Sequence, residues 1–205
     1  MLPQVVTYLP GLRPLSTMEL YTDTYYIQWI QAGDVACFAC LLDKYSRPIH
    51  SLILKVVRSQ EEAEELAQDT FMKVFKNLAS FKGDCSFSTW IYRIAYNTAV
   101  SETRRRKREW ACIDQARLAN LPDSEAERMD AWEGRQEYLD ALARAVGELE
   151  PEERALVTLF YYEEYSVSEC AGITQMSESN IKVRLHRIRK KLYILVNTQL
   201  HGSEK

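Results

Sequence analysis

Apolar residues recur at helical intervals along most of the chain, and this periodicity constrains the fold more than any other feature. The clearest stretch follows Ser59, which forms a capping-box pattern with Glu62. Its expected buried face consists of Ala63, Leu66, Ala67, Thr70, Phe71, Val74 and Leu78. Only seven glycines and six prolines occur in 205 residues, which disfavours a turn-rich β fold. The pattern therefore predicts an all-α protein.

Further helices are predicted on both sides of this one. Before it, helices are expected over residues 20–30 and 34–57, the second capped by Asp34 and kinked at Pro48. After it, a helix begins near Phe87 and runs into a block of cations. The remaining helices are expected from about 137 to 147, from 151 to 160, from 167 to 176 and from 178 to 197.

Two of the later helices have expected buried faces. The helix that ends near Gly147 is expected to bury Leu139, Leu142 and Val146. The last helix is expected to bury Ile181, Leu185, Ile188, Leu192 and Leu195. Because these residues lie three or four positions apart, each helix would present one apolar stripe to a core.

These segments divide the chain into two small helical domains joined by a flexible linker. Residues 1–17 hold three prolines and are expected to be disordered, with Met18 as an alternative start. The first domain is assigned to residues 18–110, an acidic linker to 111–136 and the second domain to 137–200. The linker's roughly 25 residues could span about 80 Å when extended. Two DNA sites one or two helical turns apart lie roughly 35–70 Å from each other, so one chain could reach both.

Cations are concentrated in two blocks although the net charge is -3. Residues 104–108 read RRRKR, and six cations lie between residues 182 and 191. The acidic residues 123–137 separate the blocks. A single charge run is usually a solvated face, whereas two basic blocks separated in this way favour two anion-binding surfaces.

The segment around the first basic block has the composition of a single-strand binding surface. The other faces of the helix are left to Tyr92, Arg93, Tyr96, Asn97, Ser101 and Arg104, while its apolar side consists of Trp90, Ile91, Ile94, Ala95 and Thr98. Bases stack on aromatic rings while cations follow the phosphates, which such a helix could provide. The alternative is an ordinary amphipathic helix with a solvated basic tail.

The second basic block lies in a helix-turn-helix pattern. Ser166 and Glu169 form a capping box for a short helix, and Ser177 can cap the longer basic helix that follows. In such a motif the second helix enters the major groove with its N-terminal residues at the base edges. The alternative is a helical hairpin with a basic exposed stripe.

Other functional classes find little support in the sequence. The five cysteines are scattered, and the pair Cys37 and Cys40 lacks two further ligands for zinc. None of the three histidines lies three residues after a glutamate, as helical di-metal enzymes require. No stretch reaches the roughly 18 apolar residues of a membrane span. We therefore expect a cytoplasmic protein with no catalytic residues, metal, cofactor or membrane insertion.

The first domain resembles region 2 of the extracytoplasmic-function group of RNA polymerase sigma factors. Residues 64–78, EELAQDTFMKVFKNL, resemble region 2.2, which docks on the largest subunit of the polymerase. The docking residues implied by the resemblance are Glu65, Leu66, Gln68, Asp69 and Lys73. Residues 81–100, FKGDCSFSTWIYRIAYNTAV, and the arginines after them resemble regions 2.3 and 2.4, which open the minus-ten element and hold its single strand. The implied minus-ten residues are Lys82, Asp84, Ser86, Phe87, Trp90, Arg93, Asn97, Arg104, Arg105 and Arg106.

Residues 149–192 resemble region 4, which reads the minus-35 element as duplex DNA. The implied contacts are Ser177, Ser179, Asn180, Lys182, Val183, Arg184 and Arg187. The chain departs from the family pattern at several positions. Cys170 replaces an aliphatic residue, Gln175 replaces a turn glycine, and Glu178 and Asn180 stand where Val and Thr are common. Glu178 and Asn180 therefore leave open which bases the reading helix prefers.

The resemblance implies a sigma factor whose partners are core RNA polymerase, promoter DNA and an anti-sigma factor. It would direct the polymerase to promoters and help to melt the minus-ten element without catalysing a reaction. The alternative is a conventional helix-turn-helix regulator with an N-terminal sensor domain. The segment 81–108 discriminates between the two, because a sensor domain needs no strand-binding helix rich in aromatic residues and arginine.

Overall fold

The computed structural model describes residues 22–105 and 136–201, and every regular element in these ranges is helical. The predictions for residues 1–17, for nearly all of the 111–136 linker and for Arg106 lie outside them. The fold class is thus the all-α class expected from the periodicity. The chain divides into two compact units, residues 1–44 and 45–205, and the boundary falls within one helix.

The first unit holds helix α1 (Asp23–Gln31), the 3₁₀ turn η1 (Val35–Cys37) and the start of helix α2 (Phe38–Val57). The Asp34 side chain accepts a hydrogen bond from the Ala36 amide at 3.2 Å, so it caps the short turn that leads into α2. Lys44 and Asp23 form an ion pair at 2.6 Å. Helix α2 continues through Pro48 to Val57 in the second unit.

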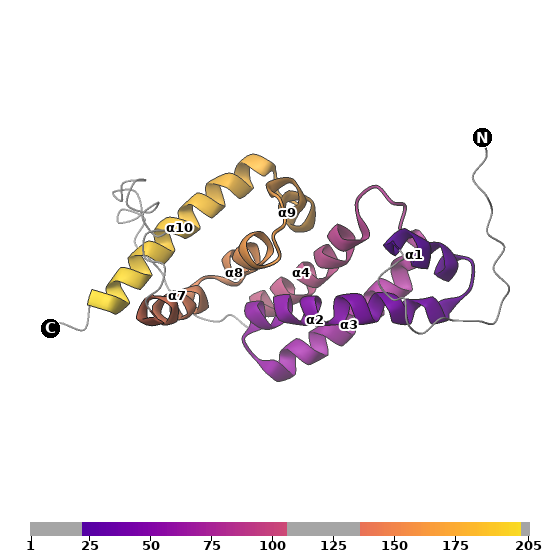
Figure 1. Ribbon diagram of the computed structural model, residues 1–205, viewed down its shortest axis with the longest axis horizontal. Helices are drawn as coiled ribbons and strands as arrows, with labels where there is room; N and C mark the ends of the chain where they lie inside the picture. Colours follow the sequence, from indigo (N-terminus) through magenta and orange to yellow (C-terminus); the bar gives the residue numbers. More distant parts are fainter. Residues whose placement is uncertain (1–21, 106–135, 202–205) are drawn as a thin grey trace. The chain divides into compact units, whose positions relative to one another are not determined.

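The second unit holds the remaining elements, all of which Figure 1 labels except the short turns. They are α3 (Gln60–Asn77), the 3₁₀ turn η2 (Leu78–Ser80), α4 (Phe87–Arg105), α7 (Gln136–Glu148), α8 (Pro151–Val157), the π-helical turn η4 (Thr158–Tyr162), α9 (Val167–Thr174) and α10 (Glu178–His201). The helix expected over 151–160 is therefore α8 followed by a π turn, which apolar spacing alone does not reveal.

Helix α3 has the start and the buried face that the sequence predicts. The Ser59 hydroxyl accepts a hydrogen bond from the Glu62 amide at 3.4 Å. Ala63, Thr70 and Val74 are completely buried, and Leu66 is half-buried. The charged side chains on the opposite face are exposed, so α3 separates a core from a free polar surface.

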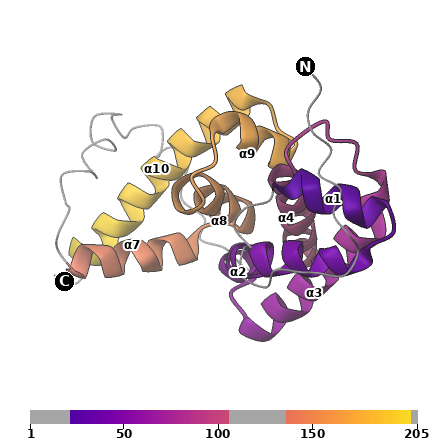
Figure 2. The same cartoon turned by 45° about the vertical axis from the view of Figure 1, so that its right-hand side comes forward.

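Helix α4 is buried on two sides, although the sequence indicates only one apolar face. It contacts α3 and also α9, between which it runs in Figure 2. Ile91 and Ala95 are buried as expected, but Tyr92 and Tyr96 are only 2% and 5% exposed. The sequence assigns these two tyrosines to faces other than the apolar one, where bases could stack on them, but in this structure α8 and α9 cover that side of the helix.

The packing of α7 against α10 also corrects the sequence analysis. The buried residues of α7 are Tyr138, Ala141 and Ala145, whereas Leu139 is 51% exposed. Leu142 and Val146 are half-buried. The two alanines allow the helix backbones to approach closely, which a leucine stripe would prevent. Four of the five residues predicted for the core face of α10 are buried, and Leu195 is half-buried.

The helix-turn-helix forms as predicted from its capping residues. The Ser166 hydroxyl accepts a hydrogen bond from the Glu169 amide at 3.2 Å, and the Glu169 carboxylate accepts one from the Ser166 amide at 2.9 Å. Helix α9 ends at Gln175, whose φ of 61° is left-handed. The Ser177 hydroxyl accepts a hydrogen bond from the Asn180 amide at 3.3 Å, at the start of α10. Helix α10 continues to His201, beyond its predicted end near residue 197.

Candidate nucleic-acid interface

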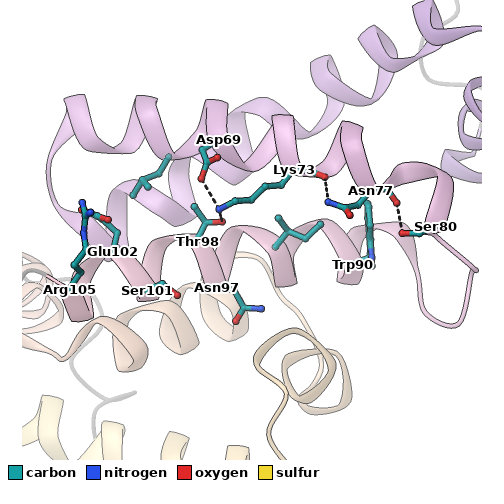
Figure 3. A pocket seen from close by; sticks show the side chains of 12 residues that line it. Asp69, Lys73, Asn77, Ser80, Trp90, Asn97, Thr98, Ser101, Glu102 and Arg105 are labelled. Carbon is teal, nitrogen blue, oxygen red and sulfur yellow. Dashed lines mark hydrogen bonds and ion pairs between the residues drawn. The ribbon is translucent and has the colours of Figure 1, made fainter.

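The outer face of α3 presents the residues that were predicted to dock on the polymerase. Glu65, Gln68, Asp69 and Lys73 are exposed, and Leu66 is half-buried. The Lys73 ammonium lies 2.6 Å from the Asp69 carboxylate. It also donates a hydrogen bond to the Thr98 hydroxyl on α4 at 3.1 Å, as Figure 3 shows. These contacts hold a charged ridge at the junction of the two helices.

A groove of about 630 Å³ lies between α3 and α4. Its lining includes Leu66, Asp69 and Lys73 from the predicted docking set and Trp90, Asn97 and Arg105 from the predicted minus-ten set. Figure 3 shows Asp69 and Lys73 of α3 close to Thr98 of α4. The structure therefore brings together two residue sets that were assigned to different partners.

An aromatic cluster supports one end of this groove. The Phe87 ring is 4% exposed and lies 5.5–5.7 Å, centroid to centroid, from the rings of Tyr45, Phe81 and Trp90. Trp90 is half-buried and lines the groove. Phe87 is thus placed behind Trp90, where it fixes the orientation of the indole.

The loop before α4 carries the remaining predicted residues of strand capture. Lys82, Asp84 and Ser86 are exposed, and Gly83 has a φ of 81° that a residue with a side chain adopts at a cost. The Ser86 hydroxyl accepts a hydrogen bond from the Thr89 amide at 3.1 Å. This contact caps the first turn of α4 and fixes the end of the loop.

The cations of α4 differ in their surroundings. Arg93 is half-buried, and Asn97 is exposed four residues later. Arg105 is exposed and pairs with Glu102 at 2.8 Å. The Arg104 guanidinium binds the Glu152 carboxylate of α8, and this hydrogen bond and its charge raise the pKa of Arg104. One predicted minus-ten residue is therefore held by the helix-turn-helix domain.

The predicted minus-35 residues lie in the first half of α10 and the turn before it. Ser177, Ser179 and Asn180 are exposed near the helix start. Lys182, Val183 and Arg187 are also exposed. Arg184 is half-buried and donates a hydrogen bond to Glu152 at 3.3 Å. This exposed, basic N-terminal half of a helix is the part that a recognition helix inserts into the major groove.

Sequence reasoning missed several residues beside these surfaces. Met72 and Phe75 on α3 are 54% and 43% exposed, next to the predicted docking residues. Met72 lies four residues after Gln68 and three after Asp69, so helical spacing could have indicated it. Arg154 is among the residues that match the region 4 pattern best, but nothing local points to its contacts or to those of Glu152, which lie on distant segments of the chain.

The described residues form neither a metal site nor a membrane span. In the ranges 22–105 and 136–201 the structure shows no group of three or more metal-ligating side chains. Within the same ranges no helix is both long enough and apolar enough to cross a bilayer. Cys37 and Cys40 are half-buried and form no disulfide, and Cys170 is completely buried. Burial raises the pKa of the Cys170 thiol to about 11.

Two family models match the chain. The model of sigma-70 region 2 matches residues 41–109, and that of sigma-70 region 4 matches residues 139–192. Together they cover more than half of the chain, and they include α3, α4 and the helix-turn-helix. The first match covers the predicted docking and strand-capture residues, and the second covers the predicted reading residues.

Curated relatives and solved structures agree with these matches. The chain is 29% identical over 187 residues to the RNA polymerase sigma-H factor of Pseudomonas aeruginosa, covering 83% of this chain and 91% of the relative. It is 27% identical over 174 residues to the ECF RNA polymerase sigma factor SigW of Bacillus subtilis, covering 81% and 92%.

Two solved complexes have a similar fold. The structure of CnrH with the cytosolic domain of CnrY matches with a TM-score of 0.61 at 20% identity, covering 89% of this chain and 99% of that one. The sigma factor RpoE with the anti-sigma factor NepR from Bartonella quintana matches with a TM-score of 0.56 at 20% identity, covering 82% and 98%. With the helix-turn-helix, the groove and both family models, these likenesses show that the chain belongs to the extracytoplasmic-function group of the sigma-70 family of RNA polymerase sigma factors.

Proposed function

We propose that this sigma factor uses three surfaces to start transcription: a polymerase-docking face, a strand-capture surface and a duplex-reading helix. As a sigma factor, it binds core RNA polymerase and directs it to specific promoters. The observation that best supports the proposal is the groove between α3 and α4, whose lining takes residues from both predicted sets, so that a docking face and a strand-capture surface can lie side by side. The reading helix α10 supplies the third surface.

The docking face is the exposed side of α3. Gln68, Asp69 and Lys73 provide its polar contacts, and Met72 and Phe75 provide apolar area beside them. Polar residues around exposed apolar side chains are typical of a protein interface. We assign this face to the largest subunit of core polymerase.

The strand-capture surface runs from the 82–86 loop along α4. Its cations, Arg93, Arg104 and Arg105, would follow the phosphates of the displaced strand. Trp90 offers an aromatic face at the groove, and Asn97 offers an exposed amide. The buried Phe87 would act from behind Trp90 by fixing its position rather than by contacting a base.

The reading helix would place Asn180, Val183 and Arg187 toward the minus-35 element. Arginine reads guanine through two acceptors in the major groove, and an exposed valine can contact the methyl group of thymine. The hydroxyls of Ser177 and Ser179 lie at the helix start, where phosphate contacts are common. The serines would therefore position the helix, and the other three residues would select bases.

We further assign the protein to the cytoplasm, with no covalent chemistry of its own, and propose an anti-sigma factor as its regulator. The last assignment is supported by the complex of RpoE with NepR, whose sigma chain shares this fold. The conventional regulator with a sensor domain is not favoured, because the region 2 family model matches residues 41–109.

Purified protein added to core RNA polymerase should support specific initiation from a genomic promoter without another sigma factor. Trp90→Ala combined with Arg93→Ala should reduce open-complex formation far more than it reduces core binding. Asn97→Ala should also reduce open-complex formation more than core binding. It should leave the aromatic cluster intact, because the Asn97 side chain is exposed. Permanganate reactivity of the melted strand and a core-binding titration measure the two steps.

Met72→Glu should show the opposite pattern and weaken core binding by roughly tenfold, about 1.4 kcal/mol. Leu139→Glu is the matched control, because it places the same charge at an equally exposed apolar position on α7. If every variant lost core binding and open-complex formation to the same extent, the assignment of these two steps to different surfaces would be contradicted. Absence of both core binding and specific initiation by the wild-type chain would contradict the sigma function itself.

A further inference from the structure

One carboxylate binds an arginine from each of the two DNA-binding surfaces. Glu152, at the second position of α8, accepts a hydrogen bond from Arg104 Nε at 3.0 Å through one oxygen. Its other oxygen accepts one from Arg184 Nη1 at 3.3 Å. Partial burial by itself raises the pKa of Glu152, but the hydrogen bonds and charges of the two arginines outweigh it and lower the pKa. The carboxylate is therefore held in its charged form.

Further contacts hold the same elements together. The Tyr92 hydroxyl donates a hydrogen bond to the Glu163 carboxylate at 2.7 Å, and the Tyr92 and Tyr165 rings lie 4.9 Å apart. At the end of α2, the Lys55 ammonium lies 3.3 Å from the centroid of the Tyr162 ring. These contacts include a hydrogen bond, a ring contact and a cation–π contact, and Tyr92 is only 2% exposed.

This arrangement cannot contact both promoter elements at once. Two groups that bind one carboxylate lie within roughly 9 Å of each other. Two DNA sites one or two helical turns apart are separated by roughly 35–70 Å. If Arg104 contacts the minus-ten strand and Arg184 the minus-35 duplex, both arginines must leave Glu152. The structure therefore corresponds to a closed state that is unable to engage a promoter.

We propose that Glu152 is an internal clasp that occupies one DNA-contacting arginine from each domain and keeps the free sigma factor closed until it joins the polymerase. The proposal rests on the proposed function, from which it takes the role of Arg104 and the reading role of α10, and it takes Arg184 as one of the minus-35 contacts that the family resemblance implies. A carboxylate takes the place of a phosphate at both guanidinium groups, so promoter binding and closure compete for the same donors.

Closure leaves the polymerase-docking face accessible. Gln68, Asp69 and Met72 on α3 remain exposed while α8 and α9 cover the other side of α4. Core polymerase can therefore dock on the closed chain, and opening follows docking. This order prevents the free protein from occupying promoters without polymerase.

The clasp is tested by small-angle X-ray scattering of the full chain without DNA. Glu152→Gln removes the charge, and Glu152→Lys places a cation between two arginines. We expect the radius of gyration to rise by at least about 2 Å above the roughly 17 Å of a compact chain of this length, and to rise most for the lysine variant. Glu137→Gln is the matched control, an exposed carboxylate on α7 for which the described residues show no ion pair, and it should leave the scattering unchanged.

The second measurement is binding of the free chain to a duplex promoter at which the wild-type holoenzyme initiates. Glu152→Gln should bind about fivefold more tightly than Glu137→Gln, which has the same net charge. Unchanged scattering in both Glu152 variants would overturn the clasp, as would equal DNA binding by the two glutamine variants. Failure of the wild-type holoenzyme to initiate would instead count against the proposed function, while the scattering would still report on closure.

Discussion

Arg154 is the largest of the fully buried side chains among the described residues, at 1% exposure. Its Nε donates a hydrogen bond to the Lys55 carbonyl at 2.9 Å, and its Nη2 donates one to the Val56 carbonyl at 2.6 Å. Its Nη1 donates to the carbonyls of Gly147 and Leu149. A planar guanidinium can satisfy this many acceptors because its donors point in fixed directions. One side chain thus joins the end of α2 to the helix-turn-helix domain.

Arg154→Ala should lower the free energy of unfolding by about 3 kcal/mol or more, because it leaves several buried carbonyls without donors. Arg154→Lys should recover only part of this loss, since an ammonium cannot reach carbonyls on both sides. Urea unfolding followed by circular dichroism measures both. Arg144→Ala on α7 is the control, because this arginine is exposed and bonds only to Gln199 among the contacts described. A loss below about 1 kcal/mol for Arg154→Ala would contradict this account.

At the scale of single elements, the turn of the helix-turn-helix carries local strain. Gln175 has a φ of 61°, in the left-handed region that glycine adopts without cost. This is the position at which the sequence departs from the glycine common in the family. The capping residues Ser166 and Ser177 on either side hold the turn in place. The motif therefore forms in spite of an unfavourable residue at its centre.

Gln175→Gly should raise the free energy of unfolding by about 1 kcal/mol, because glycine relieves the left-handed backbone. Ser168→Gly within α9 is the control and should lower it by about 0.5–1 kcal/mol, because that position is helical. Thermal and urea unfolding measure both changes. Since Gln175 precedes the reading helix, affinity for the minus-35 duplex should not change. If Gln175→Gly and Ser168→Gly lowered the free energy of unfolding equally, the turn would not be strained.

At the scale of the whole molecule, α4 serves two domains at once. One side packs on α3 and lines the groove, and the other is covered by α8 and α9. A Cβ atom placed on Gly172 of α9 would lie 3.2 Å from Thr89 Cγ2 of α4, so the two helices are in close contact there. This proximity offers a way to lock the closed state.

A disulfide between Thr89→Cys and Gly172→Cys is expected to form, because a γ-atom of residue 89, the position that a cysteine sulfur would take, lies in contact with the Cβ position of residue 172. It is introduced into a chain whose native cysteines are replaced by serine or alanine. The oxidised protein should dock on core polymerase but lose promoter-specific initiation by at least about tenfold. Reduction should restore initiation, and either single cysteine variant should be insensitive to oxidant. Full initiation by the oxidised double variant would show that opening is unnecessary.

The sequence by itself determined the helices and their order. Helical periodicity, the capping residues Ser59, Ser166 and Ser177, and Pro151 at the start of α8 act within a few residues, so they can be recognised without a structure. The family resemblance likewise identified the candidate surfaces, and the core face of α3 followed from its spacing alone.

Only the tertiary structure decided which helix faces meet. It buried Tyr92 and Tyr96 beneath a second domain and turned Leu139 outward. It also joined Glu152 to Arg104 and Arg184, which lie 48 and 32 positions away in the chain. These outcomes depend on contacts between segments far apart in sequence, which leave no periodic or capping signal. Helix α4 was therefore identifiable from its residues as a candidate strand-binding helix, but its link through Glu152 to α10 was not.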